Sequence, residues 1–475
     1  MIENKEQFKE LFRAKFASLH GKGIKNGTNL EKYQALASLV RDEIAADWIA
    51  TKQRFDQQNK KQVYYFSIEF LLGRMLGTNL INTGLRDIAA EGLRDLGIDL
   101  QELEEQEADA GLGNGGLGRL GADFLDSMAS LGIPGHGCGI RYKYGLFKQK
   151  IVDGYQVELP DDWLKNGNAW EIRKSEKAVE VRFGGHVRID YVNGELVFYH
   201  EDYETVLAVP YDIPIIGYRN NVINTLRLWS AEAVHKDFDL SFFNRGEYLK
   251  AVEYKNSVEA ITQVLYPDDS TRSGKILRLK QQYFFVSAGL QSIIRRYKKK
   301  HGSLEGLQDK IAIHINDTHP ALCIPELMRI LMDEEGLGWD AAWEIASKVI
   351  SYTNHTILPE ALEVWPIDLF QPLLPRIYLI VEEINRRLIQ QVLEKYQGNW
   401  QKAQEMAVIS NGYVRMANLS VVGSHRVNGV SEVHSGILQN HLMKNFHQFY
   451  PWKFCNKTNG ISHRRFLIKA NPGLA

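Results

Sequence analysis

The sequence predicts an α/β protein: a doubly wound, mostly parallel sheet with flanking helices and a β-rich insertion. Apolar, strand-like runs alternate with stretches of helical periodicity along most of the 475 residues. This alternation is typical of a parallel sheet covered by helices on both faces. Strand-like segments replace it between about residues 179 and 228, where Asn193-Gly194 separates two alternating runs, the strongest short hairpin signal.

In chain order, helices are expected first, over residues 1–60, because apolar side chains recur there at spacings of three and four. An α/β domain is expected over residues 61–460, and it begins with the nearly all-apolar strand 63–70. Glu69 stands inside that strand. Since buried carboxylates need partners, it is expected either to pair with an arginine or to belong to a site.

The remaining elements follow from periodicity and turn signals. Further helices are expected at 246–264, 276–300, 324–332, 339–352 and 374–396, and strands at 137–147, at 311–315 and, running into a turn, at 419–425. The basic cluster at residues 295–300 is expected to be the solvated end of a helix.

A glycine-rich loop at residues 107–121 is the most unusual stretch, with five glycines between Gly111 and Gly118 and an apolar helix after it. A loop of this kind at a helix N-terminus binds anions, because the first amides lack partners and the dipole end is positive. The loop also fits G-x-G-x-x-G, but a dinucleotide site needs a strand before it, and here an acidic, helix-like run precedes it. An anion- or sugar-binding loop is therefore favoured over a dinucleotide site or a plain surface loop.

Composition excludes several functional classes. The net charge of -1 provides no long-range field for nucleic acid or for an acidic membrane surface. Three widely spaced cysteines, Cys138, Cys323 and Cys455, form no disulfide or metal pattern and indicate a reducing compartment. The start of the chain lacks an apolar signal core, and no apolar run is long enough to span a membrane, so a cytoplasmic protein is expected.

The polar residues after strand 311–315 and the later Ser424 are of the types used in three kinds of catalytic chemistry. His314, Asp317 and His319 have no H-E-x-x-H or cysteine pair beside them, so no metal site is expected. Ser424 lacks the G-x-S-x-G spacing of a hydrolase. Two-carboxylate glycoside hydrolysis through Asp317, Glu360 or Glu363 remains the enzymatic alternative, since sequence does not give the separation of the carboxylates.

Several motifs lie in the same order as in a known family, from about residue 30 to the last residue. They are Gly111-Leu-Gly-Asn-Gly-Gly-Leu-Gly-Arg-Leu120, Phe124-Leu-Asp-Ser-Met-Ala129, Asn316-Asp-Thr-His-Pro-Ala-Leu322, Tyr352-Thr-Asn-His-Thr356, Val422-Gly-Ser-His425 and Asn456-Lys-Thr-Asn-Gly460. The chain thereby resembles the α-glucan (glycogen, starch or maltodextrin) phosphorylases. The resemblance implies one half of a GT-B-type glycosyltransferase.

Enzymes of this family transfer the terminal glucosyl unit of an α-1,4-glucan to inorganic phosphate, which yields glucose 1-phosphate with retention. Their pyridoxal 5'-phosphate relays a proton through its phosphate. By resemblance, Asn114, Gly115, Gly116 and Leu117 line the glucosyl and phosphate pocket, and the Gly116 amide donates to the phosphate on the cofactor side. Asp317, His319 and His355 lie at the reacting glucose, where His355 offers its carbonyl to a sugar hydroxyl. Asn459 bonds the distal hydroxyl, and residues 266–274, with Asp268, Asp269 and Ser270, form a mobile gate.

The chain departs from the family pattern in three ways. The Gly-Thr-x-Asn-Met-Lys-type motif that carries the pyridoxal lysine does not occur in it. It therefore resembles only the N-terminal half, with residues 461–475 beginning the crossing to a C-terminal cofactor domain, and alone it is expected to be inactive and not to retain the cofactor. Leu71 stands where many relatives have a tyrosine near the cofactor ring. The basic, serine-bearing tail of the phosphorylation-controlled animal enzymes is absent from the start, and nucleotide-effector residues are not convincingly matched, which predicts a constitutive enzyme.

The expected partners are an α-1,4-glucan (glycogen or maltodextrin), inorganic phosphate and glucose 1-phosphate. Family members dimerise through N-terminal segments, so the resemblance makes a homodimer a candidate assembly. A glucan-binding module without catalysis is the non-enzymatic alternative.

Overall fold

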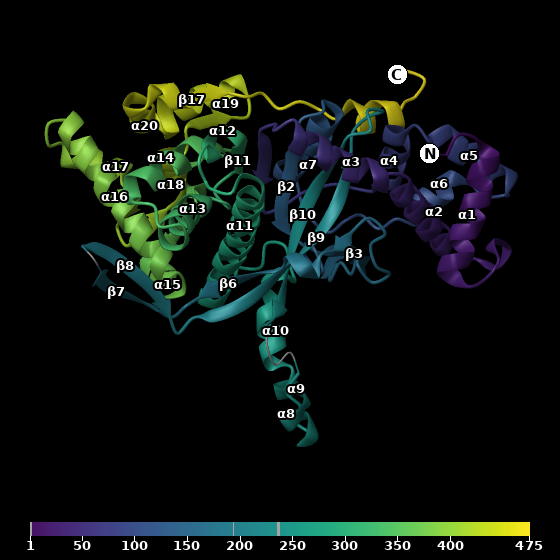
Figure 1. The fold of residues 1–475 in the computed structure, drawn as a ribbon, viewed down its shortest axis with the longest axis horizontal. Helices are drawn as coiled ribbons and strands as arrows, with labels where there is room; N and C mark the ends of the chain where they lie inside the picture. The colour runs from purple at the N-terminus through teal and green to yellow at the C-terminus, as the bar shows by residue number, and fades with distance from the viewer. Residues whose placement is uncertain (1, 193, 235–237) are drawn as a thin grey trace.

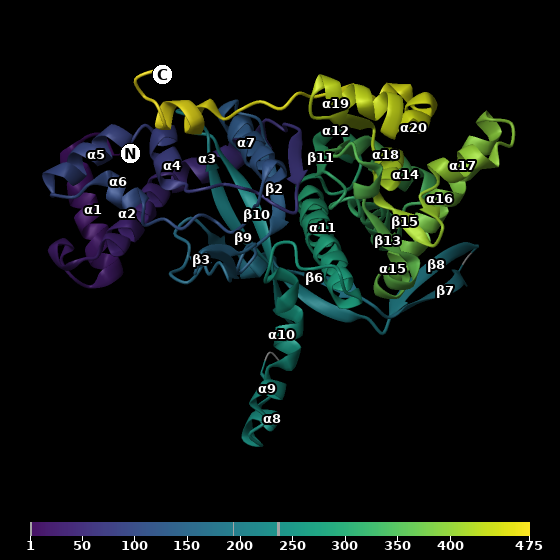
Figure 2. The same cartoon turned by 180° about the vertical axis from the view of Figure 1, so that it is seen from behind.

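A computed structural model describes residues 2–192, 194–234 and 238–475 (Figures 1 and 2). Its main sheet has the strand order β17-β16-β12-β11-β1-β2-β10-β9-β5, and β6 also pairs with β9. The strands of this sheet are β1 (Gln62–Phe66), β2 (Gly135–Ile140), β5 (Ile172–Arg173), β6 (Val179–Phe183), β9 (Glu204–Ile216), β10 (Ile223–Ala233), β11 (Ile311–Asn316), β12 (Ile350–Thr353), β16 (Arg426–Gly429) and β17 (Phe454–Asn456).

The sheet is parallel from β17 to β10 and antiparallel where β9 meets β10, β5 and β6. From β1 the chain passes to β2 and β10 on one side, and it later returns to β11 on the other side of β1. This change of direction makes the gap between β1 and β11 a topological switch point. In such sheets, ligands bind beyond the carboxyl ends of the strands at that point.

Helices cover both faces of the sheet, as predicted. They are α1 (Lys5–His20), α2 (Asn29–Glu43), α3 (Ala45–Gln57), α4 (Leu76–Thr83), α5 (Arg86–Asp95), α6 (Leu100–Glu104), α7 (Gly116–Ser130), α8 (Leu240–Asn244), α9 (Tyr248–Ala251), α10 (Glu253–Glu259), α11 (Arg272–His301), α12 (Leu307–Lys310), α13 (Cys323–Arg329), α14 (Trp339–Val349), α15 (Ile367–Leu373), α16 (Pro375–Lys395), α17 (Trp400–Met406), α18 (Met416–Gly423), α19 (Glu432–Ile437) and α20 (Lys444–Phe449). Short 3-10 or π-helical turns lie at Ile24–Asn26, Ser175–Lys177, Ala260–Thr262, Ile330–Glu334, Pro359–Ala361, Leu438–Leu442, Pro451–Lys453 and Arg464–Lys469.

Two neighbouring residues of β2 show how tightly the helices pack on both faces. A methyl group added to Gly137 would lie 3.0 Å from Leu125 of α7. The next residue, Cys138, instead faces α11: a methyl group added to Gly289 of that helix would lie 3.8 Å from the Cys138 Cβ. Because successive strand residues point to opposite faces, α7 and α11 cover opposite faces of the same strand. Burial on both faces likewise explains why β1 is apolar or aromatic after Gln62, over Val63–Phe66.

The predicted β-rich insertion is confirmed, and it extends the main sheet by its antiparallel edge. The hairpin of β7 (His186–Val192) and β8 (Glu195–Glu201) stands apart, and Asn193 of its predicted turn lies outside the described residues. Another hairpin, β3 (Lys148–Val152) with β4 (Tyr155–Leu159), and a small sheet of β13 (Val364–Pro366), β14 (Ile409–Ser410) and β15 (Tyr413–Arg415) complete the strands. Helices α8 to α10 project from the body as a stalk (Figure 1).

Several predicted element boundaries are wrong, and the strand predicted over 137–147 ends at Ile140. Strand β1 ends at Phe66, so Glu69 lies beyond the strand. The helix predicted over 339–352 ends at Val349, and the next four residues form the buried strand β12. The segment predicted to begin a strand at residue 419 belongs to helix α18. Both of the latter segments are short, continuously apolar and buried, and periodicity does not separate a buried helix from a buried strand in such runs.

The last residues return to the N-terminal part of the protein. After β17 the chain crosses one edge of the molecule, and its final turns lie over α4 and α7 (Figure 2). Arg464 pairs there with Asp126 of α7, and Lys469 lies 3.3 Å from Glu104. No helix in the described part of the chain is long and apolar enough to cross a bilayer.

Candidate active site

The glycine loop is held against the segment that follows β1. The amide of Phe70 donates to the Leu112 carbonyl (2.7 Å), and that of Leu71 donates to the Gly118 carbonyl (2.9 Å). A side chain at Gly113 would begin 2.5 Å from the backbone nitrogen of Leu71. Gly113 must therefore be glycine, because two backbone segments pack directly against each other there.

The next two glycines have a different environment. Gly116 is the first residue of α7 and Gly115 precedes it, and no side chain caps this helix start. A methyl group added to either residue would meet no atom within 4 Å. Packing within the chain therefore does not require glycine here. The helix start faces open space, with its first amides and the positive end of the dipole available to a ligand.

Glu69 joins this loop to the predicted gate. Its carboxylate, in a side chain only 4% exposed, accepts hydrogen bonds from the Asn114 amide (2.5 Å) and from the Tyr266 hydroxyl (2.8 Å). These partners replace the arginine considered from the sequence. Burial and the Glu69 charge raise the pKa of Tyr266, which keeps its hydroxyl protonated as the donor.

Asp317 and His319 follow β11 at the switch point. Asp317 has φ 62°, an uncommon value for a residue with a side chain, and its backbone amide donates to the Thr353 carbonyl (2.9 Å). The ring of His319 lies 6.0 Å from that of Tyr266, and its Nδ1 is buried without a partner in the described chain. An unpaired buried polar atom in a site indicates a place for a ligand or water.

His355 is tied to the glycine loop through Asn316. Its Nε2 lies 2.6 Å from Asn316 Oδ1, while Asn316 Nδ2 donates to Ser67 Oγ (3.1 Å) and to the Leu117 carbonyl (3.4 Å). Because the side-chain oxygen of Asn316, Oδ1, can only accept a hydrogen bond, His355 carries its proton on Nε2. Burial lowers the pKa of His355, which favours the neutral ring.

Asn459 lies farther along the same edge, past the end of β17. It is linked to the others by a chain of hydrogen bonds: its amide donates to the Val430 carbonyl (2.9 Å), and the Val430 amide donates to His434 Nδ1 (3.1 Å). His434 then donates from Nε2 to Asn354 (3.1 Å), the neighbour of His355. Sequence reasoning did not assign a role to His434, and it included Asn316 in a motif without its link to His355, because the bonds to Asn354 and to His355 join residues distant in sequence.

The predicted gate, residues 266–274, is partly exposed: it occupies the end of the loop before α11, and its last three residues are the first residues of that helix. Ser270 donates to Asp268 from both its amide (2.9 Å) and its hydroxyl (2.8 Å), and Asp269 pairs with Arg278. A side chain at Gly274 would begin 1.8 Å from the Asp268 carbonyl oxygen, so the loop folds tightly onto the start of α11.

The other chemistries find less support. Both nitrogens of His314 lie near hydroxyls, Ser351 at 2.8 Å and Thr353 at 2.6 Å, and no group of three metal-ligating side chains occurs among the described residues. Glu363 accepts hydrogen bonds from Gln282 (2.7 Å) and from Thr318 (3.2 Å), whereas Glu360 is exposed in a 3-10 turn.

Comparison with known proteins identifies the family and relatives of the chain. The profile of a family described as carbohydrate phosphorylase matches residues 93–475. Glycogen phosphorylase of Bacillus subtilis (strain 168) is 55% identical over the whole chain, which covers 58% of that relative. The enzyme of Chlamydia pneumoniae is 50% identical over 93% of the chain (54% of the relative), and the human muscle form is 47% identical over the whole chain (57% of the relative).

The chain belongs to the carbohydrate phosphorylase family. It spans a little more than half the length of the curated relatives that it matches.

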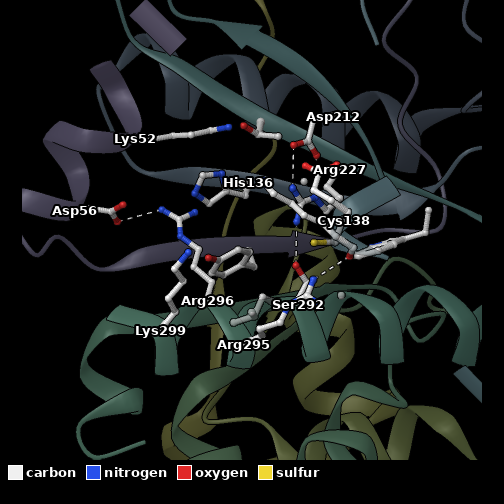
Figure 3. A pocket seen from close by; sticks show the side chains of 18 residues that line it. Lys52, Asp56, His136, Cys138, Asp212, Arg227, Ser292, Arg295, Arg296 and Lys299 are labelled. Carbon is white, nitrogen blue, oxygen red and sulfur yellow. Dashed lines mark hydrogen bonds and ion pairs between the residues drawn. The ribbon is translucent and has the colours of Figure 1, made fainter. Parts of the chain in front are cut away.

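This phosphorylase-family chain also has a cavity of about 580 Å³ near the amino-terminal halves of β1, β2 and β10 (Figure 3). Arg296, expected in a solvated helix end, instead points into it and lies 3.1 Å from Asp56. Arg227 donates to both carboxylate oxygens of Asp212 (2.8 Å each). Burial lowers the pKa of Lys52, which lines the same cavity, to about 8.

Replacing Glu69 tests whether its carboxylate connects the glycine loop to the predicted gate, residues 266–274. Glu69→Ala leaves the Asn114 amide and the Tyr266 hydroxyl without their acceptor, so we expect a loss of about 1–3 kcal/mol in the free energy of unfolding. Amide hydrogen exchange should accelerate at residues 112–116 and 266–274. Asp268→Ala, which changes the same gate away from Glu69, is the control. Unchanged exchange at residues 112–116 in Glu69→Ala would refute the connection.

The buried His314 predicts an acid-sensitive contribution to stability. Burial lowers the pKa of His314 to about 4, while the unfolded side chain titrates near its ordinary value of 6.5. As pH falls from about 6.5 toward 4, His314 becomes protonated in the unfolded state but stays neutral in the folded state. The free energy of unfolding therefore decreases, by about 2 kcal/mol at pH 5. Urea denaturation should show a correspondingly weaker pH dependence for His314→Phe, which retains a ring beside Tyr65. Equal pH dependence in both proteins would contradict this assignment.

Proposed function

We propose that this chain supplies the glucan-side half of an α-glucan phosphorylase active site. The reaction transfers the terminal glucosyl unit of an α-1,4-glucan to inorganic phosphate and yields glucose 1-phosphate with retention. The observation that carries the proposal is the open, uncapped helix start at Gly115 and Gly116, connected through Leu117 and Asn316 to His355 at the switch point.

Each predicted site residue receives a role in this proposal. The Gly116 amide donates to phosphate, and Asn114, Gly115 and Leu117 line the pocket. Asp317 and His319 contact the reacting glucose, and the unpaired Nδ1 of His319 supports a polar partner there. The carbonyl of His355 and the side chain of Asn459 bind sugar hydroxyls, and residues 266–274 close over the cleft.

The loop alone is too weak to hold phosphate tightly. A helix N-terminus contributes about 0.3–1 kcal/mol at an exposed site and up to about 2 kcal/mol when partly buried. Since about 1.4 kcal/mol corresponds to a tenfold change in affinity, the loop accounts for less than about two orders of magnitude. Lysine or arginine side chains from the remaining half of the enzyme must supply the rest.

The residues present fit part of a pyridoxal phosphate site. The open amides at Gly115 and Gly116 suit a group that carries phosphate, but the lysine motif for covalent attachment does not occur in this chain. When bound, the cofactor supplies a phosphate that exchanges a proton with the substrate phosphate. What this chain contributes is orientation: it binds the sugar hydroxyls and directs the loop amides at the phosphate.

Two alternatives make different predictions. In a glycosidase, water replaces phosphate as the acceptor and free sugar is the product; the hydrogen bonds that Glu363 accepts from Gln282 and Thr318 disfavour this role for it. A glucan-binding module without catalysis would bind the same sugars but would give no turnover with any second half.

Activity measurements on the chain and on a completed enzyme test the proposal. With pyridoxal phosphate, maltoheptaose and phosphate, the isolated chain should form no glucose 1-phosphate and retain no cofactor absorbance after dialysis. Fusion to the remaining half of the Bacillus subtilis enzyme should restore phosphate-dependent turnover. Product from the isolated chain, or release of free glucose without phosphate from the fusion, would overturn the proposal.

Gly116→Ala in the fusion tests the loop itself. The added methyl group meets no atom of the chain, so stability should be unchanged, but the methyl group occupies ligand space. We expect kcat/KM for phosphate to fall at least about tenfold, equivalent to about 1.4 kcal/mol. Gly436→Ala, equally unobstructed but in α19, is the matched control and should keep full activity. Equal kinetics for the two variants would exclude close approach of a ligand at Gly116.

We further propose that the completed enzyme is constitutive. Supporting this, Arg296 and Arg227 of the cavity in Figure 3 already have carboxylate partners in Asp56 and Asp212. Titration of AMP into the active fusion should leave the initial rate unchanged, and a several-fold rise would contradict this.

We also propose a cytoplasmic homodimer. The three cysteines are free, as expected in a reducing compartment, and Leu11, Leu19 and Ile49 on the N-terminal helices are exposed apolar side chains available to a second copy.

A further inference from the structure

A second cavity lies at the opposite edge of the sheet from the glycine loop. It has a volume of about 520 Å³ and is bounded by α14, α16, the residues that open β16 and the turn Pro451–Lys453. Trp339, Trp343 and Trp452 are among its lining residues, and the Arg387 guanidinium lies over the Trp339 ring, 4.9 Å from its centroid. Because it lies at the amino ends of β12 and β16, it is separate from the candidate active site at their carboxyl ends.

The lining of this cavity includes a polar group that the chain leaves unused. Ser424 is fully buried, and its hydroxyl has no hydrogen-bond partner in the described chain. A buried hydroxyl without a partner is costly, and in a polar cavity it is normally satisfied by a ligand or an ordered water.

Two cations of the lining lack carboxylate partners among the described residues. Lys453, only 8% exposed, donates to the Val421 and Val422 carbonyls (3.0 and 2.9 Å), and its Nζ lies 4.3 Å from the centroid of the Tyr450 ring, so its third hydrogen has no oxygen acceptor among the described residues. Arg426 donates from Nη1 to the carbonyls of Trp452 (2.7 Å) and His425 (3.3 Å), so its other guanidinium nitrogens remain available.

The remaining cations at this cavity are neutralised. Arg387 lies 2.7 Å from Asp340 and 2.7 Å from Glu383, and Lys348 lies 2.6 Å from Glu344. The positive charge without a carboxylate partner therefore belongs to Arg426 and, in its protonated form, to Lys453, and both line the cavity together with the unpaired serine.

We propose that this cavity binds an organic phosphate, a phosphate monoester with a cyclic body. Its phosphoryl oxygens accept hydrogens from Ser424, Lys453 and Arg426, and its ring lies against the indoles. A phosphoryl group offers three acceptor oxygens and negative charge to three groups that have hydrogens to donate. Tryptophan faces give a flat ring a large apolar contact.

Capping of α18 by Lys453 explains only part of this arrangement. The two carbonyls that it binds close the end of that helix, as a lysine often does. Burial also lowers the pKa of Lys453 to about 7, which a bound anion would reverse. Neither effect accounts for the unused hydroxyl of Ser424 or for the unpaired Arg426.

Phenylphosphonate, a stable analogue of a phosphate monoester with a flat ring, is a suitable probe. In the 475-residue chain labelled with 5-fluorotryptophan, it should shift the fluorine resonance of Trp452, assigned through Trp452→Phe. Phenol, which lacks the charge, and inorganic phosphate, which lacks the ring, should each shift that resonance less at equal concentration. No shift with phenylphosphonate, or an equal shift with inorganic phosphate, would overturn the proposal.

Ser424→Ala separates binding from structure. The hydroxyl has no partner to lose, so the free energy of unfolding should not fall, while affinity for phenylphosphonate should drop about three- to tenfold for one lost hydrogen bond. Arg426→Gln should weaken binding at least as much. Lys348→Gln, at the same cavity but with a neutralised charge, is the control and should bind normally. Unchanged affinity in both Ser424→Ala and Arg426→Gln would refute the site.

Discussion

The candidate active site depends on the position of one buried carboxylate. Glu69 lies just beyond the carboxyl end of β1 and holds the Asn114 amide and the Tyr266 hydroxyl at the same time. A buried carboxylate needs strong hydrogen bonds, and these partners come from the glycine loop and from the start of the gate. The loop that starts α7 and the loop that leads into α11 are therefore anchored to one group.

The sheet determines where this anchor lies. Helices α7 and α11 cover opposite faces of β2. The strands that follow β1 in the chain first extend the sheet on the β2 side, and the later strands, from β11 on, extend it on the other side of β1. The loops beyond the ends of β1, β11 and β12 consequently meet at one edge, which brings Leu117, Asn316 and His355 into contact although they are far apart in sequence. Gly113 makes the close approach to Leu71 sterically feasible, whereas Gly115 and Gly116 leave space that the chain itself does not fill.

The same architecture leaves the two edges of the sheet with different polar chemistry. At the carboxyl edge, the open amides of Gly115 and Gly116 lie near carboxylates such as Glu69, which already accepts hydrogen bonds from the chain. At the amino edge, Arg426 and the protonated form of Lys453 carry positive charge in a cavity lined by tryptophans, and their hydrogen bonds go to carbonyls rather than to carboxylates. Parallel strands place these environments at opposite ends, so one chain can carry two separate sites.

The sequence by itself was enough to predict the doubly wound class, the N-terminal helices and the β-rich insertion, because each has a local signature in periodicity or turn residues. Its motifs also pointed to the phosphorylase family, to which the chain belongs. Sequence did not place β12 or α18, since short buried apolar runs suit either element. The partners of Glu69, the bond between His355 and Asn316, and the position of Arg296 in a cavity were decided only by tertiary structure. They join residues separated by tens to hundreds of positions, and only the packing of the sheet and its helices determines those distances.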